Sequence, residues 1–291
     1  MKIVACMPAY NEEKTIAKII LLTQKHVDQV LVCDDGSTDL TAEIAEKMGA
    51  TVISHKENMG KGAALRTLFK KAIEEQADII VTLDSDGQHD PTEIPKLIEP
   101  ILAGKADITI GHRLQSKEMP LYRRIGNKLL TALLRKAAKA PVLDTQSGFR
   151  AYSRKALQAI TIDIDTMAVD SHIIVEATRK GLRVKEVPVK AAYKGLKHST
   201  LNPITHFYTV AAYLLKLIAG KKPITWLGVP GTILVAAGFL AGLRVVKIFI
   251  ENNYQIAVGT ALIAVMLIIL GFMLLTTATI LYAIRETLKT A

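Results

Sequence analysis

Short apolar runs, rich in β-branched residues, recur from the N-terminus to about residue 190 and alternate with segments of helical spacing. The runs cover residues 2–7, 27–33, 50–54, 77–83, 107–111 and 184–189. A short run that is apolar at almost every position is typical of a strand buried on both faces of a parallel sheet. Strands that alternate with helices predict an α/β fold of βαβ units, with parallel strands throughout.

Helical spacing predicts helices at about residues 11–24, 38–48, 61–75, 91–103 and 168–180, and another that starts near residue 154. The first is expected to be capped by Asn11, because an asparagine side chain accepts hydrogen bonds from the unpaired N–H groups of the first turn. Glu12 and Glu13 follow in that turn, where the helix dipole favours acidic groups.

An acidic loop, Asp84-Ser85-Asp86-Gly87-Gln88-His89-Asp90, directly follows the run 77–83. Ligands of open α/β sheets bind just outside the carboxyl ends of the strands, so we expect Asp84 and Asp86 to lie over a binding crevice. Hard carboxylate oxygens suit Mg2+ or Mn2+, which keep open positions for substrate phosphates. The alternative is an acidic turn that caps the helix starting near Pro91. A cap needs one acidic group, however, and this loop supplies three.

Two glycines flank Lys61 at the start of the predicted helix 61–75. Their spacing is not that of a nucleoside-triphosphate P-loop, and no Gly-x-Gly-x-x-Gly motif follows the first predicted strand. Both an ATPase function and a dinucleotide-binding function therefore lose support.

Residues 120–139 change the pattern to a strongly amphipathic helix. Its apolar side is formed by Leu121, Tyr122, Ile125, Leu129, Leu130, Leu133 and Leu134, and its basic side by Arg123, Arg124, Lys128, Arg135, Lys136 and Lys139. Such a helix is typical of one that lies in the lipid headgroup zone, and a solvated surface helix is the alternative. Residues 202–219 predict a second interfacial helix.

Two long apolar segments, 224–250 and 256–284, follow. Each can cross a hydrocarbon core of ~30 Å, which takes roughly 20 residues. Basic residues at the outer ends of this hairpin outnumber those near its connecting loop, so both ends and the globular domain are expected in the cytoplasm. A buried helical hairpin of a soluble protein is the alternative. We therefore divide the chain into a globular domain (1–200), an interfacial helix with a linker (201–222) and a two-span cell-membrane hairpin (223–291).

The composition agrees with a membrane protein. The 291 residues are 50% hydrophobic with a mean hydropathy of +0.27, and the excess lies at the C-terminal end. A net charge of +10, beside membrane segments, indicates attraction to anionic lipids and phosphorylated substrates, and no nucleic-acid partner is expected. Cys6 and Cys33 fall in apolar runs and are expected to be buried thiols in a reducing compartment. Met1-Lys2 leads directly into the first predicted strand, so no signal peptide is expected.

Five motifs follow one another along the chain: PAYNEE at 8–13, DDGSTD at 34–39, GKGAA at 60–64, DSDGQHDP at 84–91 and DTQSGFR at 144–150. Together they resemble family 2 glycosyltransferases of the GT-A fold, and most closely the dolichyl-phosphate mannose and polyprenyl-phosphate glucose synthases. The resemblance covers about residues 1–200. It implies inverting transfer of a hexose from a donor of the GDP-mannose or UDP-glucose type to dolichyl or polyprenyl phosphate.

The resemblance also implies roles for individual residues. The nucleotide-sugar donor would be bound by Pro8, Tyr10, Glu12, Asp34, Asp35, Lys61, Asp84, Ser85, Asp86, Arg113 and Lys194. The metal would be held by Asp84, Asp86 and Gln88, and Asp86, Arg113 and Arg150 would be the catalytic residues. The acceptor phosphate would be bound by Arg113, Arg123, Asn127, Ser147, Arg150 and Lys197. His112 stands where the family has a serine, and Lys194 and Thr200 replace the arginine and lysine of a late loop, where Lys197 would compensate.

An acceptor phosphate explains why no base is needed, since its second pKa near ~6 leaves it largely ionised at neutral pH. Two other functions compete with this one. A processive polysaccharide synthase would carry a Gln-x-x-Arg-Trp segment, which is absent, because the single tryptophan is Trp226 in the membrane region. A non-catalytic, membrane-anchored nucleotide-sugar-binding protein is supported by His112 and the altered late loop. A two-span hairpin can pack against copies of itself, so a homo-oligomer is a further alternative.

Overall fold

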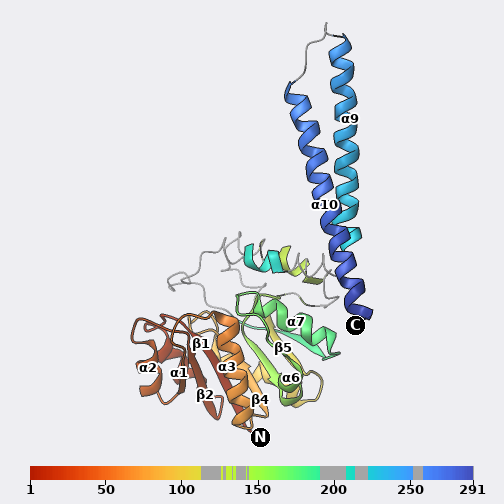
Figure 1. The fold of residues 1–291 in the computed structure, drawn as a ribbon. Coiled ribbons are helices and arrows are strands. Elements are labelled where there is room, and N and C mark those ends of the chain that lie inside the picture. The colour runs from red at the N-terminus through yellow and green to blue at the C-terminus, as the bar shows by residue number, and fades with distance from the viewer. Residues whose placement is uncertain are drawn as a thin grey trace. The chain divides into compact units, whose positions relative to one another are not determined.

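The computed structural model describes residues 1–112, 126, 129–132, 134, 135, 142, 144–190, 208–213, 222–251 and 258–290. Its contacts divide the chain into two compact units, Met1–Tyr213 and Leu214–Ala291. Figure 1 shows that the first unit is a sheet flanked by helices and that the second is a pair of long helices. The predicted α/β fold with two apolar C-terminal helices is therefore confirmed.

The described strands of the first unit form one seven-stranded sheet in the order β3-β2-β1-β4-β6-β5-β7. Their bounds are β1 Ile3–Ala9, β2 Gln29–Asp34, β3 Thr51–Ser54, β4 Ile79–Thr82, β5 Ile108–His112, β6 Arg150–Ser153 and β7 Val184–Pro188. The pairs β1–β2, β1–β4, β2–β3 and β5–β7 are parallel, as predicted. The central strands β1 and β4 are buried on both faces of the sheet, which explains why their sequences are apolar at nearly every position.

Strand β6 is antiparallel to both of its neighbours, β4 and β5. The expectation of parallel strands throughout is therefore wrong. The sequence predicts a loop at 144–150 and a helix that starts near Arg154, with no strand between them. A four-residue strand that begins with Arg150 lacks the apolar run that marks the other strands. Since β6 runs against its neighbours, it begins at the sheet edge where they end. The loop before β6 therefore lies beside the carboxyl end of β4.

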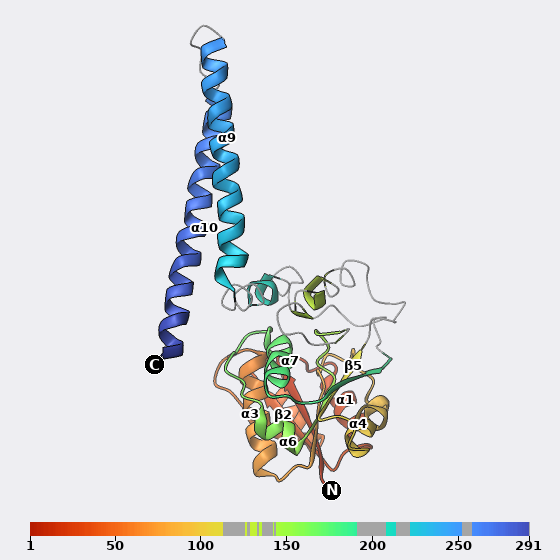
Figure 2. The same ribbon diagram turned by 90° about the vertical axis from the view of Figure 1, so that its right-hand side faces the viewer.

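Helices cover both faces of the sheet (Figure 2). Their bounds are α1 Ile16–Thr23, α2 Thr41–Lys47, α3 Lys61–Glu74, η1 Pro91–Glu93, α4 Ile94–Leu102, α6 Arg154–Ala159 and α7 Val169–Arg179. Buried side chains of α1 and α4 form one core with Ala5 and Met7 of β1. Helix α3 packs against β1 and β2. Cys6 and Cys33 are buried free thiols, as expected.

Asn11 does not cap a helix. Helix α1 begins at Ile16, and Asn11 has a left-handed φ of 55°. The N–H of Asn11 donates to Ser37 Oγ at 2.9 Å, and its Oδ1 accepts from the Thr38 N–H at 2.9 Å. The predicted cap is wrong because Asn11 joins the loop after β1 to the loop after β2.

The predicted amphipathic helix 120–139 lies largely outside the described residues, which here are 126, 129–132, 134 and 135. Leu130 and Leu134 are buried, whereas Leu129 is 51% exposed. The Oγ1 atoms of Thr131 and Thr145 lie 3.2 Å apart, and both residues are buried. The described part of this segment therefore packs against the globular domain, and its apolar residues do not all face outward.

The described part of the second unit consists of the π-helical turn η2 Ile224–Gly228, α9 Val229–Glu251 and α10 Val258–Thr290. Two segments, of 28 and 30 residues, are long and apolar enough to cross a membrane. A Cβ added to Gly238 would lie 2.7 Å from the Ile268 side chain and 2.9 Å from the Ala264 carbonyl oxygen. Glycine therefore allows α9 and α10 to pack closely, as small residues do between membrane helices.

Candidate active site

The carboxyl end of β4 gathers loops from several parts of the sequence. Parallel strands β1, β2 and β4 end at this edge, and antiparallel β6 begins there. The motifs at residues 8–13, 34–39, 84–91 and 144–150 are therefore brought to one edge of the sheet. Crevices outside the carboxyl ends of strands are the usual binding sites of α/β sheets.

The acidic loop after β4 is ordered by its own side chains. The N–H of Gln88 donates to Asp86 Oδ1 at 2.9 Å, and its Nε2 donates to Asp86 Oδ2 at 2.7 Å. The N–H of Asp84 donates to Nδ1 of His89, a buried side chain that stacks on Phe149. Gln88 and Asp86 are therefore in contact, and Asp84 lies in the same loop; their role as metal ligands stays a prediction.

The last acidic residue of this loop has a different function. Asp90 precedes η1, and its carboxylate accepts a hydrogen bond from the Thr92 N–H at 3.0 Å. Capping therefore accounts for Asp90. It does not account for Asp84 and Asp86, which lie before the cap.

Lys61 lies between two carboxylates. Its Nζ is 2.9 Å from Asp84 Oδ1 and 2.9 Å from Asp170 Oδ2. Burial alone would lower the pKa of this ammonium, but the charges of Asp170 and Asp84 outweigh burial and raise the pKa above its usual range. Lys61 therefore stays protonated and adds a fixed positive charge to the site. Sequence reasoning missed Asp170, because it lies in an otherwise ordinary helix, α7, far from the motifs in sequence.

Gly148 is required by this ion pair. A Cβ at position 148 would lie 2.7 Å from Asp84 Oδ2 and 2.8 Å from Lys61 Nζ, distances that real contacts do not show. The main chain of the 144–150 loop therefore packs directly on the side chains of Asp84 and Lys61. A side chain at this position would displace the ends of the Asp84 and Lys61 side chains.

The glycines beside Lys61 have a structural reason as well. Gly60 has a φ of +94°, and a Cβ on Gly62 would lie 2.0 Å from the carbonyl oxygen of Ile164. The N–H of Gly62 donates to the Asp165 carbonyl at 2.9 Å. The start of α3 therefore packs closely against residues 164–165, and this contact fixes the main chain that carries Lys61.

Asp35 is largely occupied by neighbouring groups. Its carboxylate lies 2.7 Å from Nδ1 of His55 and accepts the N–H groups of Met59 and Gly60 at 3.0 and 2.8 Å. It is also buried. Asp35 thus anchors the loop that precedes Lys61. His55, which sequence reasoning missed, is part of this anchor.

Asp34 differs from its neighbour. Its Oδ2 accepts the Ser37 N–H at 3.3 Å, whereas its buried Oδ1 has no hydrogen-bond partner in the described part of the chain. A buried acceptor without a partner costs free energy unless a ligand supplies a donor. Of the two aspartates predicted to contact the nucleoside, the geometry therefore favours Asp34.

The loop after β1 adds the remaining donor-site candidates. Ser85 is buried, and its Oγ donates to the Pro8 carbonyl at 3.0 Å, so it joins this loop to the metal loop. Tyr10 is half-buried. Burial raises the pKa of Glu12 to about 7; its hydrogen bond from Thr15 opposes this shift, and the charges of Asp86, Asp84 and Asp39 add to it. The negative charges of the metal loop therefore contribute to the raised pKa of Glu12.

Arg150 is fully buried, which argues against the predicted contact with an acceptor phosphate. Its Nε and Nη2 donate to the carbonyl oxygens of Ser147 and Thr145 at 2.8 and 3.0 Å, and Nη1 donates to the Asp170 carbonyl at 2.8 Å. The guanidinium thus joins the 144–150 loop to the start of α7. The predicted contact of Arg150 with the acceptor phosphate is therefore wrong in this structure, because its guanidinium donates to main-chain carbonyl groups of the protein. Ser147 is also fully buried, and its Oγ lacks a described partner.

Five predicted site residues, Arg113, Arg123, Asn127, Lys194 and Lys197, lie outside the described residues. Their roles remain predictions.

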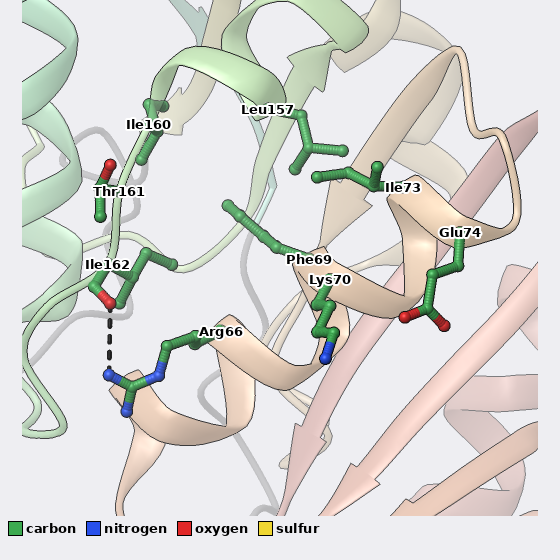
Figure 3. A pocket seen from close by; sticks show the side chains of 9 residues that line it. All are labelled: Arg66, Phe69, Lys70, Ile73, Glu74, Leu157, Ile160, Thr161 and Ile162. Carbon is green, nitrogen blue, oxygen red and sulfur yellow. Dashed lines mark hydrogen bonds between the residues drawn. The ribbon is translucent and has the colours of Figure 1, made fainter.

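A pocket of about 400 Å³ lies elsewhere in the first unit, between α3 and residues 157–162 (Figure 3). It is lined mainly by apolar side chains, and Arg66 at its edge donates to the Ile162 carbonyl at 3.3 Å. None of the predicted site residues lines this pocket, so it plays no part in the site described above.

The chemistry of the acidic loop suits a divalent cation. Carboxylate and amide oxygens are the ligands that Mg2+ and Mn2+ prefer. Within the described residues, no group of three or more histidine, cysteine, aspartate or glutamate side chains is placed to hold a metal ion. Asp84, Asp86 and Gln88 offer oxygen atoms of the kind that such an ion binds beside water and substrate phosphates.

Comparisons with known proteins agree with this site. Residues 4–161 match the model of the family described as "Glycosyl transferase family 2". The chain is 40% identical to an uncharacterized protein of Methanocaldococcus jannaschii over 76% of this chain and 92% of that protein. It is 32% identical to the UDP-N-acetylglucosamine–dolichyl-phosphate N-acetylglucosaminyltransferase of Methanococcus voltae, over 74% of this chain and 95% of that enzyme.

A solved structure is also similar. Glucosyl-3-phosphoglycerate synthase of Mycobacterium tuberculosis, in complex with Mn2+, uridine diphosphate and glucosyl-3-phosphoglycerate, aligns with a TM-score of 0.60 and 28% identity. The alignment covers 75% of this chain and 80% of that one. With its strand order, its acidic loop at the sheet edge and a family match over more than half of its length, this chain belongs to glycosyl transferase family 2.

Proposed function

We propose that this protein transfers a hexose from a nucleotide sugar to a dolichyl or polyprenyl phosphate, with inversion at the anomeric carbon. The observation that carries the proposal is the Asp84–Asp86 loop at the carboxyl end of β4, beside the charged side chain of Lys61. The two long apolar helices support a membrane-bound protein. A relative that acts on dolichyl phosphate, by its name, adds support.

The metal loop would act on the leaving nucleotide. Asp84 and Asp86, with Gln88 beside them, would hold a Mg2+ or Mn2+ ion, which neutralises the charge that grows on the diphosphate as the bond to the sugar breaks. Asp86 is held by two hydrogen bonds from Gln88, so its carboxylate is oriented before the substrate binds. Lys61 supplies a second positive charge close to this loop.

The nucleoside would lie over the loops after β1 and β2. Asp34 offers a buried acceptor without a described partner, and Tyr10 and Glu12 lie in the neighbouring loop. Asp35 supports these residues through the segment 58–60.

The acceptor needs no general base. A monophosphate is already largely ionised at neutral pH, so its oxygen can attack the sugar carbon directly. We propose that Arg113, Arg123 and Asn127 bind this phosphate together with Lys197 of the late loop, whereas Lys194 of that loop binds the nucleotide sugar. An arginine fork matches two phosphate oxygens, which favours arginine for this task. Both chain termini and the catalytic domain are expected on the cytoplasmic side.

Purified protein in detergent tests the proposal. Radiolabelled UDP- or GDP-sugars are incubated with polyprenyl phosphate and Mn2+, and label is measured in an organic-extractable, mild-acid-labile fraction. Wild-type protein should produce this lipid, and Asp86→Ala should abolish it. Label that stays aqueous with every donor and acceptor lipid would contradict the proposal, and labelled polymer would indicate a processive synthase. Full cellular function in Asp86→Ala would indicate a non-catalytic protein.

A further inference from the structure

The position of Asp170 needs an explanation beyond donor binding. It lies in the first turn of α7, is buried, and places Oδ2 2.9 Å from Lys61 Nζ. The same ammonium is 2.9 Å from Asp84 Oδ1, in the loop that would hold the metal. One cation is therefore shared between a carboxylate that the metal needs and a carboxylate that lies outside the metal loop.

A divalent ion and Lys61 would compete for Asp84. An ion bound to this carboxylate lies at ~2.1 Å from its oxygen. The ammonium already occupies the neighbourhood of Oδ1, and its side chain is only 12% exposed, so water screens the repulsion between two cations weakly. A metal ion at Asp84 would therefore repel the ammonium and weaken the contact between Lys61 and this carboxylate.

We propose that Lys61 competes with the metal for Asp84 and so makes tight metal binding depend on the nucleotide. In the metal-free protein Lys61 neutralises Asp84. When metal and nucleoside diphosphate enter together, the Lys61 ammonium leaves Asp84 and pairs with Asp170 and the diphosphate. Asp170 is the positioning residue of this exchange, because it keeps the buried ammonium paired after Asp84 has turned to the metal. This inference rests on one part of the proposed function, the role of Asp84 as a metal ligand.

The surrounding structure limits where Lys61 can go. The main chain at Gly148 is so close that a Cβ there would lie 2.8 Å from Lys61 Nζ. The start of α3 is fixed by the bond from the Gly62 N–H to the Asp165 carbonyl. Asp170 is itself held, since its main-chain carbonyl accepts from Arg150 Nη1 at 2.8 Å. Because the ammonium already contacts both carboxylates, it can exchange partners without a large movement of the main chain.

Mn2+ binding by the full-length protein in detergent tests this exchange. The dissociation constant is measured by electron paramagnetic resonance of free Mn2+, alone and with saturating UDP or GDP. Lys61→Gln should bind Mn2+ alone about fivefold or more tightly than wild type, since sites coupled in this way differ by about 5-fold or more. The gain in Mn2+ affinity that the nucleotide produces should fall in this variant. Unchanged or weaker binding of Mn2+ alone would overturn the proposal.

Asp170→Asn gives the opposite prediction. Without its second carboxylate, Lys61 keeps Asp84 as its only described carboxylate partner, so Mn2+ alone should bind several-fold more weakly than to wild type. A purely structural role of this cluster would weaken Mn2+ binding in both variants. Opposite shifts in the two variants therefore support the exchange, and shifts in the same direction contradict it.

Lys155→Gln is the matched control, because Lys155 also pairs with an aspartate, Asp107, away from the metal loop. Its Mn2+ affinity should equal that of wild type, and thermal unfolding of each variant reports whether it is folded. The readout does not depend on turnover. Wild type that binds Mn2+ as expected but transfers no sugar contradicts the proposed function and leaves this inference standing. Sugar transfer by wild type, with equal Mn2+ affinities in all variants, supports the proposed function and contradicts this inference.

Discussion

The phenol of Tyr213 lies 3.0 Å from Nδ1 of His172, and their rings meet edge to face. His172 Nε2 lies 2.9 Å from the Thr161 carbonyl, an acceptor only, so in the neutral ring Nε2 carries the hydrogen and Nδ1 accepts from Tyr213. Burial raises the pKa of Tyr213 to about 12, and Asp163 and Glu176 add to this shift, so the phenol remains a donor at neutral pH. The segment 208–213 is thereby attached to α7.

Replacing Tyr213 with phenylalanine should loosen this attachment. The change removes one hydrogen bond to a buried histidine, which costs about 1 kcal/mol. We expect faster amide hydrogen exchange at residues 208–213 and little change in α3, measured by mass spectrometry. Tyr208→Phe is the control, because Tyr208 is 73% exposed. Equal exchange in wild type and Tyr213→Phe would show that the bond does not hold the segment.

The sequence sufficed for the parts of the fold that repeat a simple pattern. The strands with continuous apolar runs, such as β1 and β4, were predicted because burial on both faces leaves a clear signal. Strand β6 was missed because it is short, begins with an arginine and obtains its burial from neighbours that are distant in sequence. Asn11 was assigned as a cap because a local pattern cannot show that its partners, Ser37 and Thr38, lie in another loop.

The candidate site divides in the same way. Asp84 and Asp86 were predicted because two carboxylates directly follow an apolar run and stand in order with four other motifs. Asp170 and His55 were missed because their partners, Lys61 and Asp35, are brought to them only by the fold. Arg150 was expected to bind phosphate, because a sequence does not show whether an arginine faces a ligand or its own main chain.

Arg150→Lys should therefore destabilise the protein. A lysine cannot supply the three fixed donors that reach the carbonyls of Thr145, Ser147 and Asp170, and buried carbonyls without partners cost about 1–3 kcal/mol. We expect a lower thermal unfolding temperature in detergent. Arg154→Lys is the matched control, because the Arg154 side chain is 46% exposed. An Arg150→Lys variant with wild-type stability and a selective loss of acceptor affinity would restore the direct contact with the acceptor phosphate.

Gly148→Ala should inactivate the enzyme with little effect on the rest of the fold. The added Cβ would displace both Asp84 and Lys61, and a displacement of about 1 Å at a reacting site can reduce the rate by ~100-fold. The measurement is the rate of lipid glycosylation at saturating donor. Gly242→Ala is the control, since a Cβ there would meet no atom within 4 Å. Near-wild-type activity of Gly148→Ala would mean that the close packing on Asp84 is not needed for catalysis.

Asp107 should make stability depend on pH in the acid range. The side chain of Arg183 donates to both carboxylate oxygens of Asp107 at 3.0 Å, and these bonds lower the pKa of Asp107 from 3.8 to about 2, although burial opposes the shift. A carboxyl whose pKa is lower in the folded state stabilises the protein above its unfolded pKa, and the contribution is lost as pH falls through the folded value. Asp107→Asn should therefore lower stability by about 1–2 kcal/mol at pH 7, after allowance for the exposure of Arg183. The difference from wild type should shrink between pH 3.8 and about 2, as followed by thermal unfolding in detergent. A difference that stays constant over this window would assign the effect to packing between β5 and β7 and not to the charge of Asp107.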